Sequence, residues 1–319
     1  MNPATDRVIV LVGPTAAGKS TLAVTAASTM IDAGHPCEVV NLDSMVVYRG
    51  MDIGTAKPSA EDQLRVRHHL VDILDITETA TVAEFQQRAR ETVADIHTRG
   101  ALPLLVGGSA LYTRAVIDQF SFPGTDPELR ADLEDQLARS GPTRLHDRLA
   151  ELDPAAAAEI LPGNGRRIVR ALEVIMLTNE PYAASLPSHE YALAGVVQVG
   201  IDGPRDWLDE RIEQRVHQMW AAGFVDEVRV LADRGLRDGR TASKALGYRQ
   251  VLAFLDGEID EDEAMRRTIA ATRRFARKQR GWHRRDDRVR WFDAREPEVA
   301  VREIVALGTD RPAVEGVEH

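Results

Sequence analysis

The chain has 319 residues, of which 44% are hydrophobic and 28% are charged, a composition typical of a globular protein. Its formal net charge of −10 excludes a surface that is basic throughout, so contact with nucleic acid would require a local basic patch. The single cysteine, Cys37, excludes a disulfide framework and a cysteine-based zinc site, and no apolar run approaches the ~20 residues of a membrane span. We therefore expect a cytoplasmic protein without membrane association.

The first third of the chain alternates between predicted strands and helices. An apolar, β-branched run at 7–12 is typical of a buried parallel strand, and a helix follows over 18–33. A second strand is predicted at 37–43 and a helix over 81–100, with a further strand at 101–109. This alternation predicts an α/β fold with a doubly wound parallel sheet of the P-loop type.

The middle of the chain departs from this pattern, because every periodic segment between about 125 and 180 is helical. A strand returns at 193–202, and helices are then predicted at 205–222, 224–235, 243–256 and 260–281, with a late strand at 288–293. We therefore divide the chain into a first part of the P-loop core at 1–122, a helical insertion at 123–192, the rest of the core with basic C-terminal helices at 193–305, and a disordered tail at 306–319.

The segment GPTAAGKS is a complete phosphate-binding loop between a predicted strand and a predicted helix. It comprises Gly13, Pro14, Thr15, Ala16, Ala17, Gly18, Lys19 and Ser20. Its spacing lets backbone N–H groups point at phosphate oxygens, and the following helix adds its positive N-terminus. Lys19 would reach the phosphates and the Ser20 hydroxyl suits Mg²⁺. The loop predicts a polyphosphate ligand without specifying the reaction.

The acid that NTPases usually place after a further apolar strand is missing from the obvious position. The strand LPLLVGG ends in two glycines, and only Asp43, at the end of the strand predicted at 37–43, supplies a carboxylate. It would lie at the carboxyl edge of the sheet beside the phosphate loop. The residues expected for nucleotide hydrolysis are therefore sparse.

Further motifs follow the loop in a fixed order. They are NLDSMVVYRGMDIGTAKP (41–58), HHLVDI (68–73), LLVGGSALY (105–112), RRIVRALEV (166–174), RIEQRVHQM (211–219) and KALGYRQ (244–250). Together they closely resemble the bacterial tRNA dimethylallyltransferases (the tRNA isopentenyltransferase, or IPP transferase, family) from about residue 8 to about residue 285. The most specific segment is DSMVVYRGMDIGTAKP.

The resemblance implies that a dimethylallyl group passes from dimethylallyl diphosphate to N6 of adenosine 37, in tRNAs that read codons beginning with U. The phosphate loop would then hold a diphosphate leaving group. Arg211 and Arg215, four residues apart on one helix face, would contact it; pairing with Glu210 and Glu213 on a solvated face is the alternative. Asp43 would orient N6 and take its proton as general base, the alternative being an outer-shell partner of Mg²⁺.

The resemblance also implies tRNA contacts for residues in several motifs. They are Asp43, Ser44, Met45, Val46, Ser109, Arg130, Arg166, Arg167, Arg170, Gly247, Tyr248 and Arg249. For the GYRQ segment, a plain helix N-terminal turn is an equal alternative. The helical insertion would clamp the anticodon stem-loop.

Basic residues concentrate near the C-terminus. Between Arg266 and Arg290 there are eleven Lys and Arg residues and only two acids, a footprint typical of RNA backbone contact. We expect Arg277 and Lys278 to bind RNA, and Phe275 and Trp282 to pack inward. The expected partners are the tRNA anticodon stem-loop and dimethylallyl diphosphate, with Mg²⁺ as cofactor and the protein as a monomer. The rival functions are a small-molecule P-loop kinase, an isopentenyltransferase acting on free adenylates, and a non-enzymatic RNA-binding module.

Overall fold

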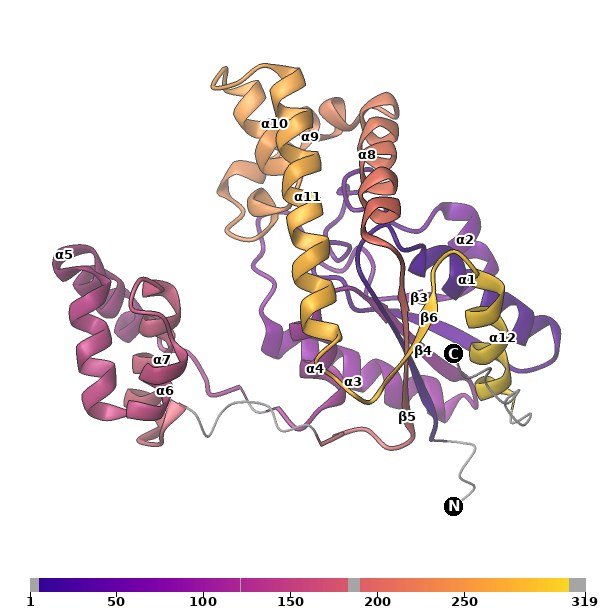
Figure 1. Ribbon diagram of the computed structural model, residues 1–319, viewed down its shortest axis with the longest axis horizontal. Helices are drawn as coiled ribbons and strands as arrows, with labels where there is room; N and C mark the ends of the chain where they lie inside the picture. Colours follow the sequence, from indigo (N-terminus) through magenta and orange to yellow (C-terminus); the bar gives the residue numbers. More distant parts are fainter. Residues whose placement is uncertain (1–5, 121, 183–189, 310–319) are drawn as a thin grey trace. The chain divides into compact units, whose positions relative to one another are not determined.

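The computed structural model describes residues 6–120, 122–182 and 190–309. Two compact units make up the chain (Figure 1). The larger unit is formed by Met1–Ile117 together with Leu193–His319, and the smaller by Asp118–Ala192. The smaller unit thus begins at 118, whereas the sequence pattern placed the start of the insertion at 123. None of the helices described has the length and hydropathy that a membrane span requires.

The larger unit is built on a six-stranded sheet whose strands all pair in parallel. The strands are β1 (Val8–Val12), β2 (Cys37–Asn41), β3 (His68–His69), β4 (Leu102–Gly107), β5 (Val196–Asp202) and β6 (Val289–Asp293). Their order across the sheet is β3-β2-β4-β1-β5-β6. The chain therefore leaves β1 in one direction and returns to its other side at β5, which makes the end of β1 a switch point where ligands bind in such sheets. The predicted α/β fold is confirmed.

Helices cover the sheet on both faces. The strand β1 is fully buried, and its Ile9 and Leu11 pack in one core cluster with residues of α1 (Lys19–Asp32) and α12 (Pro297–Gly308), among them Ile304. Helices α3 (Val82–Thr98) and α4 (Ala110–Ile117) contact each other and β4. Two-sided cover explains why the strands read as continuous apolar runs in the sequence.

Four further helices rise from the carboxyl end of the sheet, in the upper part of Figure 1. They are α8 (Arg205–Ala221), α9 (Phe224–Asp233), α10 (Tyr248–Leu255) and α11 (Glu261–His283). The helix predicted at 243–256 begins only at Tyr248, because short 3₁₀ turns at Leu236–Asp238 and Ala242–Lys244 precede it. These four helices approach the loops at the end of β1 and β2 and complete the cavities described below.

Three elements were not predicted from the sequence. The helix α2 (Ala60–Arg65) and the strand β3 are too short to show a period, whereas α12 has Pro297 at its first turn and buried Ala300 and Ile304 four residues apart. Because α12 continues to Gly308, the prediction of a disordered tail from 306 is wrong for its first residues. Residues 310–319 of that tail lie outside the described residues.

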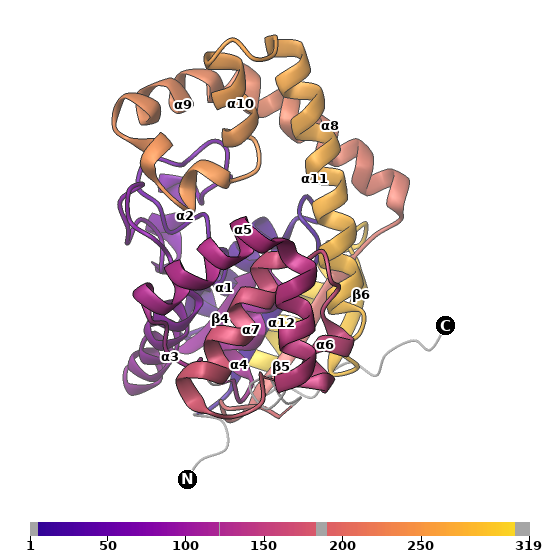
Figure 2. The same ribbon diagram turned by 90° about the vertical axis from the view of Figure 1, so that its left-hand side faces the viewer.

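The smaller unit is helical and has a core of its own. Its helices are α5 (Pro127–Leu152), α6 (Pro154–Glu159) and α7 (Gly165–Thr178), all labelled in Figure 2. Leu133, Leu145, Leu149, Ile168 and Leu172 form its apolar centre. The α5 segment bends at Gly141, whose φ of 77° lies in the left-handed region and interrupts the helix ahead of Pro142.

Candidate active site

The phosphate loop connects β1 to α1 at the switch point of the sheet. Gly13 has a φ of 149°, and a Cβ atom there would lie 2.2 Å from the carbonyl oxygen of Ile201, so only glycine fits. Gly18, with a φ of 92°, turns the chain into α1. The Lys19 ammonium donates to the carbonyl oxygens of Gly13 (2.9 Å) and Pro14 (2.7 Å), which holds it against the loop.

Burial lowers the pKa of Lys19 to about 8, an effect that the Asp43 carboxylate opposes and the Arg215 guanidinium reinforces. No carboxylate lies within 4.0 Å of the Lys19 ammonium among the residues described. Lys19 is therefore a half-buried cation that an incoming anion would stabilise.

Two arginines of α8 reach the same loop. Arg215 is half-buried, and its guanidinium lies 3.5 Å from both the Thr15 hydroxyl and the Thr55 carbonyl oxygen. Arg211 donates to the carbonyl oxygen of Ala16 (2.8 Å) and lies over the Trp207 ring at 4.7 Å. In the described part of the chain, neither guanidinium forms an ion pair within 4.0 Å. The alternative of a salt-bridged surface helix is therefore not what the structure shows.

The carboxylate of Glu213, one of the acids expected to pair with these arginines, is engaged elsewhere. It accepts a hydrogen bond from Arg273 of α11 (2.6 Å). The larger unit thus directs Lys19, Arg211 and Arg215 to one loop and leaves all three without a carboxylate partner among the described residues. Such an arrangement is suited to binding a multiply charged anion.

Asp43 lies two residues beyond β2, and its backbone is fixed by Asn41. The Asn41 side chain accepts from the Asp43 N–H (2.8 Å) and donates to the Asp43 carbonyl oxygen (2.9 Å). The Oδ1 atom of Asp43 accepts from the N–H of Met45 (2.8 Å), whereas its Oδ2 atom has no hydrogen-bond donor among the described residues. The carboxylate is thus oriented through one oxygen and open at the other, as a hydrogen-bond acceptor for a substrate requires.

Two cavities meet at this carboxylate. One of about 350 Å³ is lined mainly by apolar side chains of α8 and α10–α11, including Val216, Met219 and Phe275. The other, of about 510 Å³, is lined by polar groups, including Lys19, Ser20 and Arg211. The residues common to both walls are Thr15, Ala16, Asp43, Thr55 and Arg215. Asp43 can therefore reach a ligand in either compartment.

The residues predicted to contact RNA near Asp43 divide between these cavities. Ser44, Met45 and Ser109 line the apolar cavity, whereas Val46 lines the polar one. Tyr248 also lines the apolar cavity, although its side chain is fully buried and its hydroxyl donates to Glu227 (2.6 Å). Gly247 has a positive φ of 87° at the start of α10, as the helix-turn alternative expected, and Arg249 is exposed.

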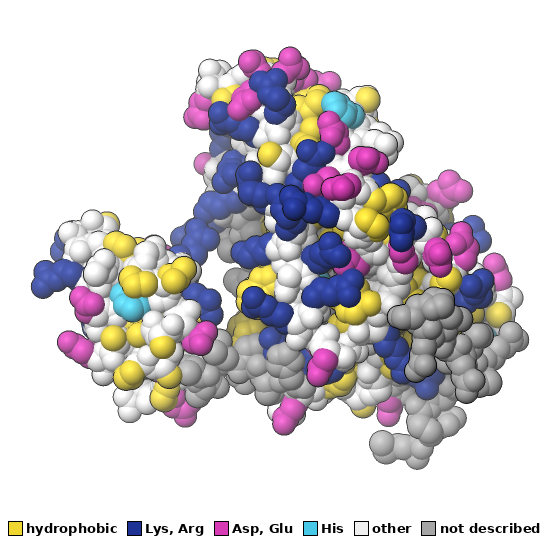
Figure 3. Space-filling view, in the orientation of Figure 1, with side chains coloured by type: hydrophobic (Ala, Val, Ile, Leu, Met, Phe, Trp, Pro, Cys, Tyr) yellow, Lys and Arg dark blue, Asp and Glu magenta, His cyan; other side chains and the backbone are white. Residues whose placement is uncertain are grey.

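Helix α11 presents a basic face to solvent and a polar face to the loops. Arg277 and Lys278 are exposed, and Figure 3 shows Lys and Arg side chains gathered along this helix. On the buried face, the Gln279 side chain accepts a hydrogen bond from the Thr15 N–H (2.9 Å). The Nε2 atom of His283 lies 3.2 Å from the Gly108 carbonyl oxygen. Nothing in the local sequence distinguishes Gln279 as a loop contact.

The prediction that Phe275 and Trp282 pack inward is wrong. Their side chains are 39% and 47% exposed, respectively. Positions 276, 279 and 283 of α11 take the buried stripe, and these two aromatic residues fall beside it. Phe275 lines the apolar cavity, where a flat aromatic surface is available to a ligand.

In the smaller unit, two of the predicted RNA contacts have a structural partner. Glu173 of α7 has a fully buried side chain, and the guanidinium groups of Arg130 and Arg170 both donate to it, as does the Thr125 hydroxyl. Burial alone would raise the pKa of Glu173, but hydrogen bonds from Arg130, Thr125 and Arg170 outweigh burial and hold it at about 2.

Arg166 and Arg167, the other two arginines predicted here, are exposed on α7. They remain open to a phosphate backbone. The sequence signal for the ion pairs of Arg130 and Arg170 was Glu173 itself, which interrupts the apolar face of RRIVRALEV three residues after Arg170.

Magnesium fits this site only if the bound anion supplies some of its ligands. Within the described ranges, no group of three His, Cys, Asp or Glu side chains could hold a metal ion. Ser20 is exposed to the polar cavity beside Lys19. Mg²⁺ is commonly bound by one or two protein oxygens together with substrate phosphates and waters, and the Ser20 hydroxyl suits that mode.

Comparisons with known proteins agree on one family. Residues 46–286 match the family model described as IPP transferase. The chain is 57% identical over 307 residues to a tRNA dimethylallyltransferase of Cutibacterium acnes (95% of this chain, 96% of the relative), and 60% identical over 287 residues to one of Kineococcus radiotolerans (90% of each).

Solved structures give the same result. A tRNA isopentenylpyrophosphate transferase of Bacillus halodurans is similar with a TM-score of 0.68, 39% identity and coverage of 96% of this chain and 98% of that one. A eukaryotic dimethylallyltransferase acting on tRNA shares the fold with a TM-score of 0.81 at 23% identity, covering 96% of this chain and 80% of that one.

Proposed function

The chain belongs to the IPP transferase family, and we propose that it transfers the dimethylallyl group of dimethylallyl diphosphate to N6 of adenosine 37 in tRNAs that read codons beginning with U. As a member of this family it is a transferase that modifies tRNA by prenylation.

The observation that carries it is the wall shared by the two cavities. On the polar side, Lys19, Arg211 and Arg215 converge on the phosphate loop without carboxylate partners among the described residues, which supports a diphosphate there. On the apolar side, the cavity of about 350 Å³ is large enough for an unstacked purine. Asp43 borders both, where the amine nitrogen of one ligand would meet the reacting carbon of the other.

The residues present suit this substitution. The N6 lone pair forms a bond to C1 of the donor, the C1–O bond breaks, and its electron pair leaves on the diphosphate. Negative charge then grows on the diphosphate oxygens, where loop amides, Lys19 and Arg215 would stabilise it. N6 loses a proton as the bond forms, and Asp43 would accept it through its open oxygen.

We propose Mg²⁺ as the divalent cation, held by the Ser20 hydroxyl and by the diphosphate. When bound, it would neutralise charge on the leaving diphosphate. Ser20 would orient the cation, while Lys19 and Arg215 bind the diphosphate from the protein side.

We also propose that the exposed basic residues bind the tRNA backbone. Arg277 and Lys278 on α11, Arg249 on α10, and Arg166 and Arg167 in the smaller unit are accessible for this role. Ser44, Met45 and Ser109 would line the entry of adenosine 37, and the smaller unit would clamp the anticodon stem-loop. We also propose that the protein acts as a monomer.

One assay distinguishes this function from its rivals. The protein is incubated with labelled dimethylallyl diphosphate, Mg²⁺ and an anticodon stem-loop carrying adenosines 36 to 38. Label transferred to N6 of adenosine 37 is the expected result. Transfer only to AMP or ADP would indicate an isopentenyltransferase of free adenylates, and consumption of ATP with a small acceptor would indicate a kinase.

A further inference from the structure

The carboxylate of Glu227 lies against three consecutive backbone N–H groups of a distant loop. Glu227 is in the first turn of α9, and it accepts from the N–H groups of Asp52 (3.0 Å), Ile53 (2.7 Å) and Gly54 (3.3 Å). It also accepts from the Tyr248 hydroxyl (2.6 Å). Successive N–H groups that point to one place form a concave site for an anion, and here a side chain of the protein is that anion.

The same loop is fixed by close packing. A Cβ atom at Gly54 would lie 2.4 Å from ring atoms of both Phe224 and Tyr248, so the loop sits directly on these rings. The two rings pack edge to face, with centroids 5.0 Å apart, and both side chains are fully buried. The Tyr248 pKa is raised by burial and by the Glu227 carboxylate, so the phenol stays protonated and continues to donate.

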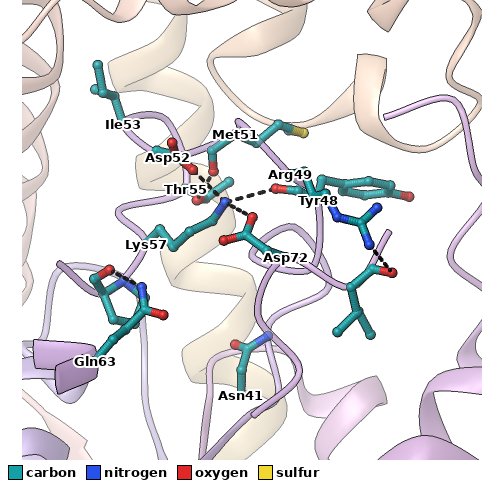
Figure 4. A network of polar contacts seen from close by, with 12 residues as sticks. Asn41, Tyr48, Arg49, Met51, Asp52, Ile53, Thr55, Lys57, Gln63 and Asp72 are labelled. Carbon is teal, nitrogen blue, oxygen red and sulfur yellow. Dashed lines mark hydrogen bonds and ion pairs between the residues drawn. The ribbon is translucent and has the colours of Figure 1, made fainter. Parts of the chain in front are cut away.

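The loop is held at its other end by Lys57. Its ammonium donates to the Tyr48 carbonyl oxygen (2.9 Å) and forms ion pairs with Asp52 and Asp72, as the dashed lines in Figure 4 show. Only 5% of the Lys57 side chain is exposed. Between these two anchors lies Thr55, whose hydroxyl donates to the Met51 carbonyl oxygen (2.6 Å) and whose own carbonyl oxygen faces the Arg215 guanidinium (3.5 Å).

We propose that Glu227 is a positioning residue for the prenyl transfer, because it fixes the loop at 52–55 so that the Thr55 carbonyl oxygen orients Arg215 toward the diphosphate. The inference rests on the proposed function. Arg215 has only two hydrogen-bond acceptors among the described residues, Thr15 and Thr55, and both contacts are long. The Thr55 carbonyl oxygen is therefore one of the two acceptors that orient its guanidinium.

A charge-neutral replacement tests this role. In Glu227→Gln the side chain keeps its size, but it loses the negative charge and its amide N–H groups would oppose the loop N–H groups. Asp226→Asn is the matched control, because Asp226 is in the same turn of α9, its side chain is 77% exposed, and it pairs only with Arg229 among the described residues. Both variants lose one negative charge from the same turn.

The measurements are calorimetric affinity for inorganic pyrophosphate, the KM and kcat for dimethylallyl diphosphate, and circular dichroism to verify folding. For Glu227→Gln we expect pyrophosphate affinity to fall by about tenfold and the donor KM to rise with it. Asp226→Asn should stay within about twofold of the wild type. A Glu227→Gln protein that melts earlier yet binds pyrophosphate like the wild type would show a purely structural role and overturn the inference.

A double-mutant cycle identifies the path through Arg215. If Glu227 acts through this guanidinium, Glu227→Gln should cause no further loss of pyrophosphate affinity when Arg215 is already replaced by alanine. Additive losses would contradict the inference. If Glu227→Gln does not fold, Tyr248→Phe replaces it in the test, because this change removes one donor to Glu227 and keeps the ring. We expect a smaller loss of pyrophosphate affinity. An unchanged pyrophosphate affinity would overturn the inference.

The proposed function fails in a different way from this inference. A wild-type protein that neither binds pyrophosphate nor prenylates the anticodon stem-loop would contradict the function. A wild type that does both, alongside a Glu227→Gln variant that matches it, would contradict only the role of Glu227.

Discussion

The Oε1 atom of Gln279 accepts a hydrogen bond of 2.9 Å from the backbone N–H of Thr15, although the two residues are 264 positions apart. Gln279 is buried on α11, and the neighbouring Arg277 and Lys278 are exposed on the same helix. The helix proposed to contact RNA therefore also fixes the loop proposed to hold diphosphate. The Gln279 side chain also packs closely on the segment after β4, since a Cβ atom at Gly108 would lie 2.4 Å from its amide nitrogen.

Replacing Gln279 with leucine should weaken donor binding. The Thr15 N–H would lose its acceptor at a partly buried position, which costs about 1–3 kcal/mol. We expect the KM for dimethylallyl diphosphate to rise by about fivefold or more, with RNA affinity nearly unchanged. Steady-state kinetics and RNA titration measure the two effects. Gln87→Leu, on the exposed face of α3, is the control, and an unaltered donor KM in Gln279→Leu would contradict the prediction.

Asp43→Asn tests the choice between a general base and a metal partner. The amide keeps the shape of the side chain but cannot accept the N6 proton, so single-turnover transfer should slow by about 10²-fold or more while RNA and pyrophosphate affinities persist. The measurement is quench-flow at saturating donor and stem-loop. If the rate recovers when Mg²⁺ is raised, Asp43 belongs to the metal and not to the proton transfer.

The phosphate loop and Asp43 were predictable because their signals are local. The fixed spacing between Gly13 and Lys19, flanked by a strand and a helix, is the local signature of a phosphate-binding loop. The position of a carboxylate at a strand end follows from the direction of the strand. The pairing of Arg211 and Arg215 on one face of α8 follows from helical periodicity alone.

The residues that hold these groups in place were not predictable. Gln279 and Glu227 act through backbone N–H groups at least 173 positions away. Because the partner is a backbone group, no particular residue type in the sequence indicates the contact. The errors at Phe275 and Trp282 have a related cause. A helix with polar groups on its buried face, such as Gln279 and His283, does not place its aromatic residues inside by default.

Diphosphate binding should take up a proton at Lys19 above neutral pH. Burial lowers the Lys19 pKa to about 8, so near pH 9 most of the free protein has a neutral amine, and the bound anion would restore its proton. Near pH 6.5 the amine is already protonated and contributes no uptake. Calorimetry of pyrophosphate in buffers of different ionisation enthalpy measures the protons bound.

Lys19→Met supplies the reference for that experiment, because protonation of pyrophosphate itself is common to both proteins. We expect the wild type to bind more protons than Lys19→Met near pH 9, and the two proteins to agree near pH 6.5. Equal uptake at both pH values would mean that Lys19 remains charged in the free protein.

The arginines of the smaller unit should divide into two classes. Arg130 and Arg170 are bound to the buried Glu173, so replacing either with alanine leaves a buried carboxylate with one partner fewer. Each of these replacements should destabilise the unit by about 3 kcal/mol, and Glu173→Gln should do the same.

The double variant Arg166→Ala/Arg167→Ala should leave stability unchanged. It should reduce the slope of log affinity for RNA against log salt concentration by about one unit or more. Hydrogen exchange of α5 and α7 peptides and RNA titration against salt separate the classes.

The pH dependence of the Glu173 contribution has a defined sign. The native pKa of about 2 lies below the ordinary value of 4.5, so the stabilisation is complete above pH 4.5 and is lost as the pH falls toward 2. The protection that Glu173→Gln removes from α5 and α7 at pH 7 should therefore shrink as the pH is lowered through this range. If the two proteins differ equally at every pH, the ionised carboxylate is not the source of the stabilisation.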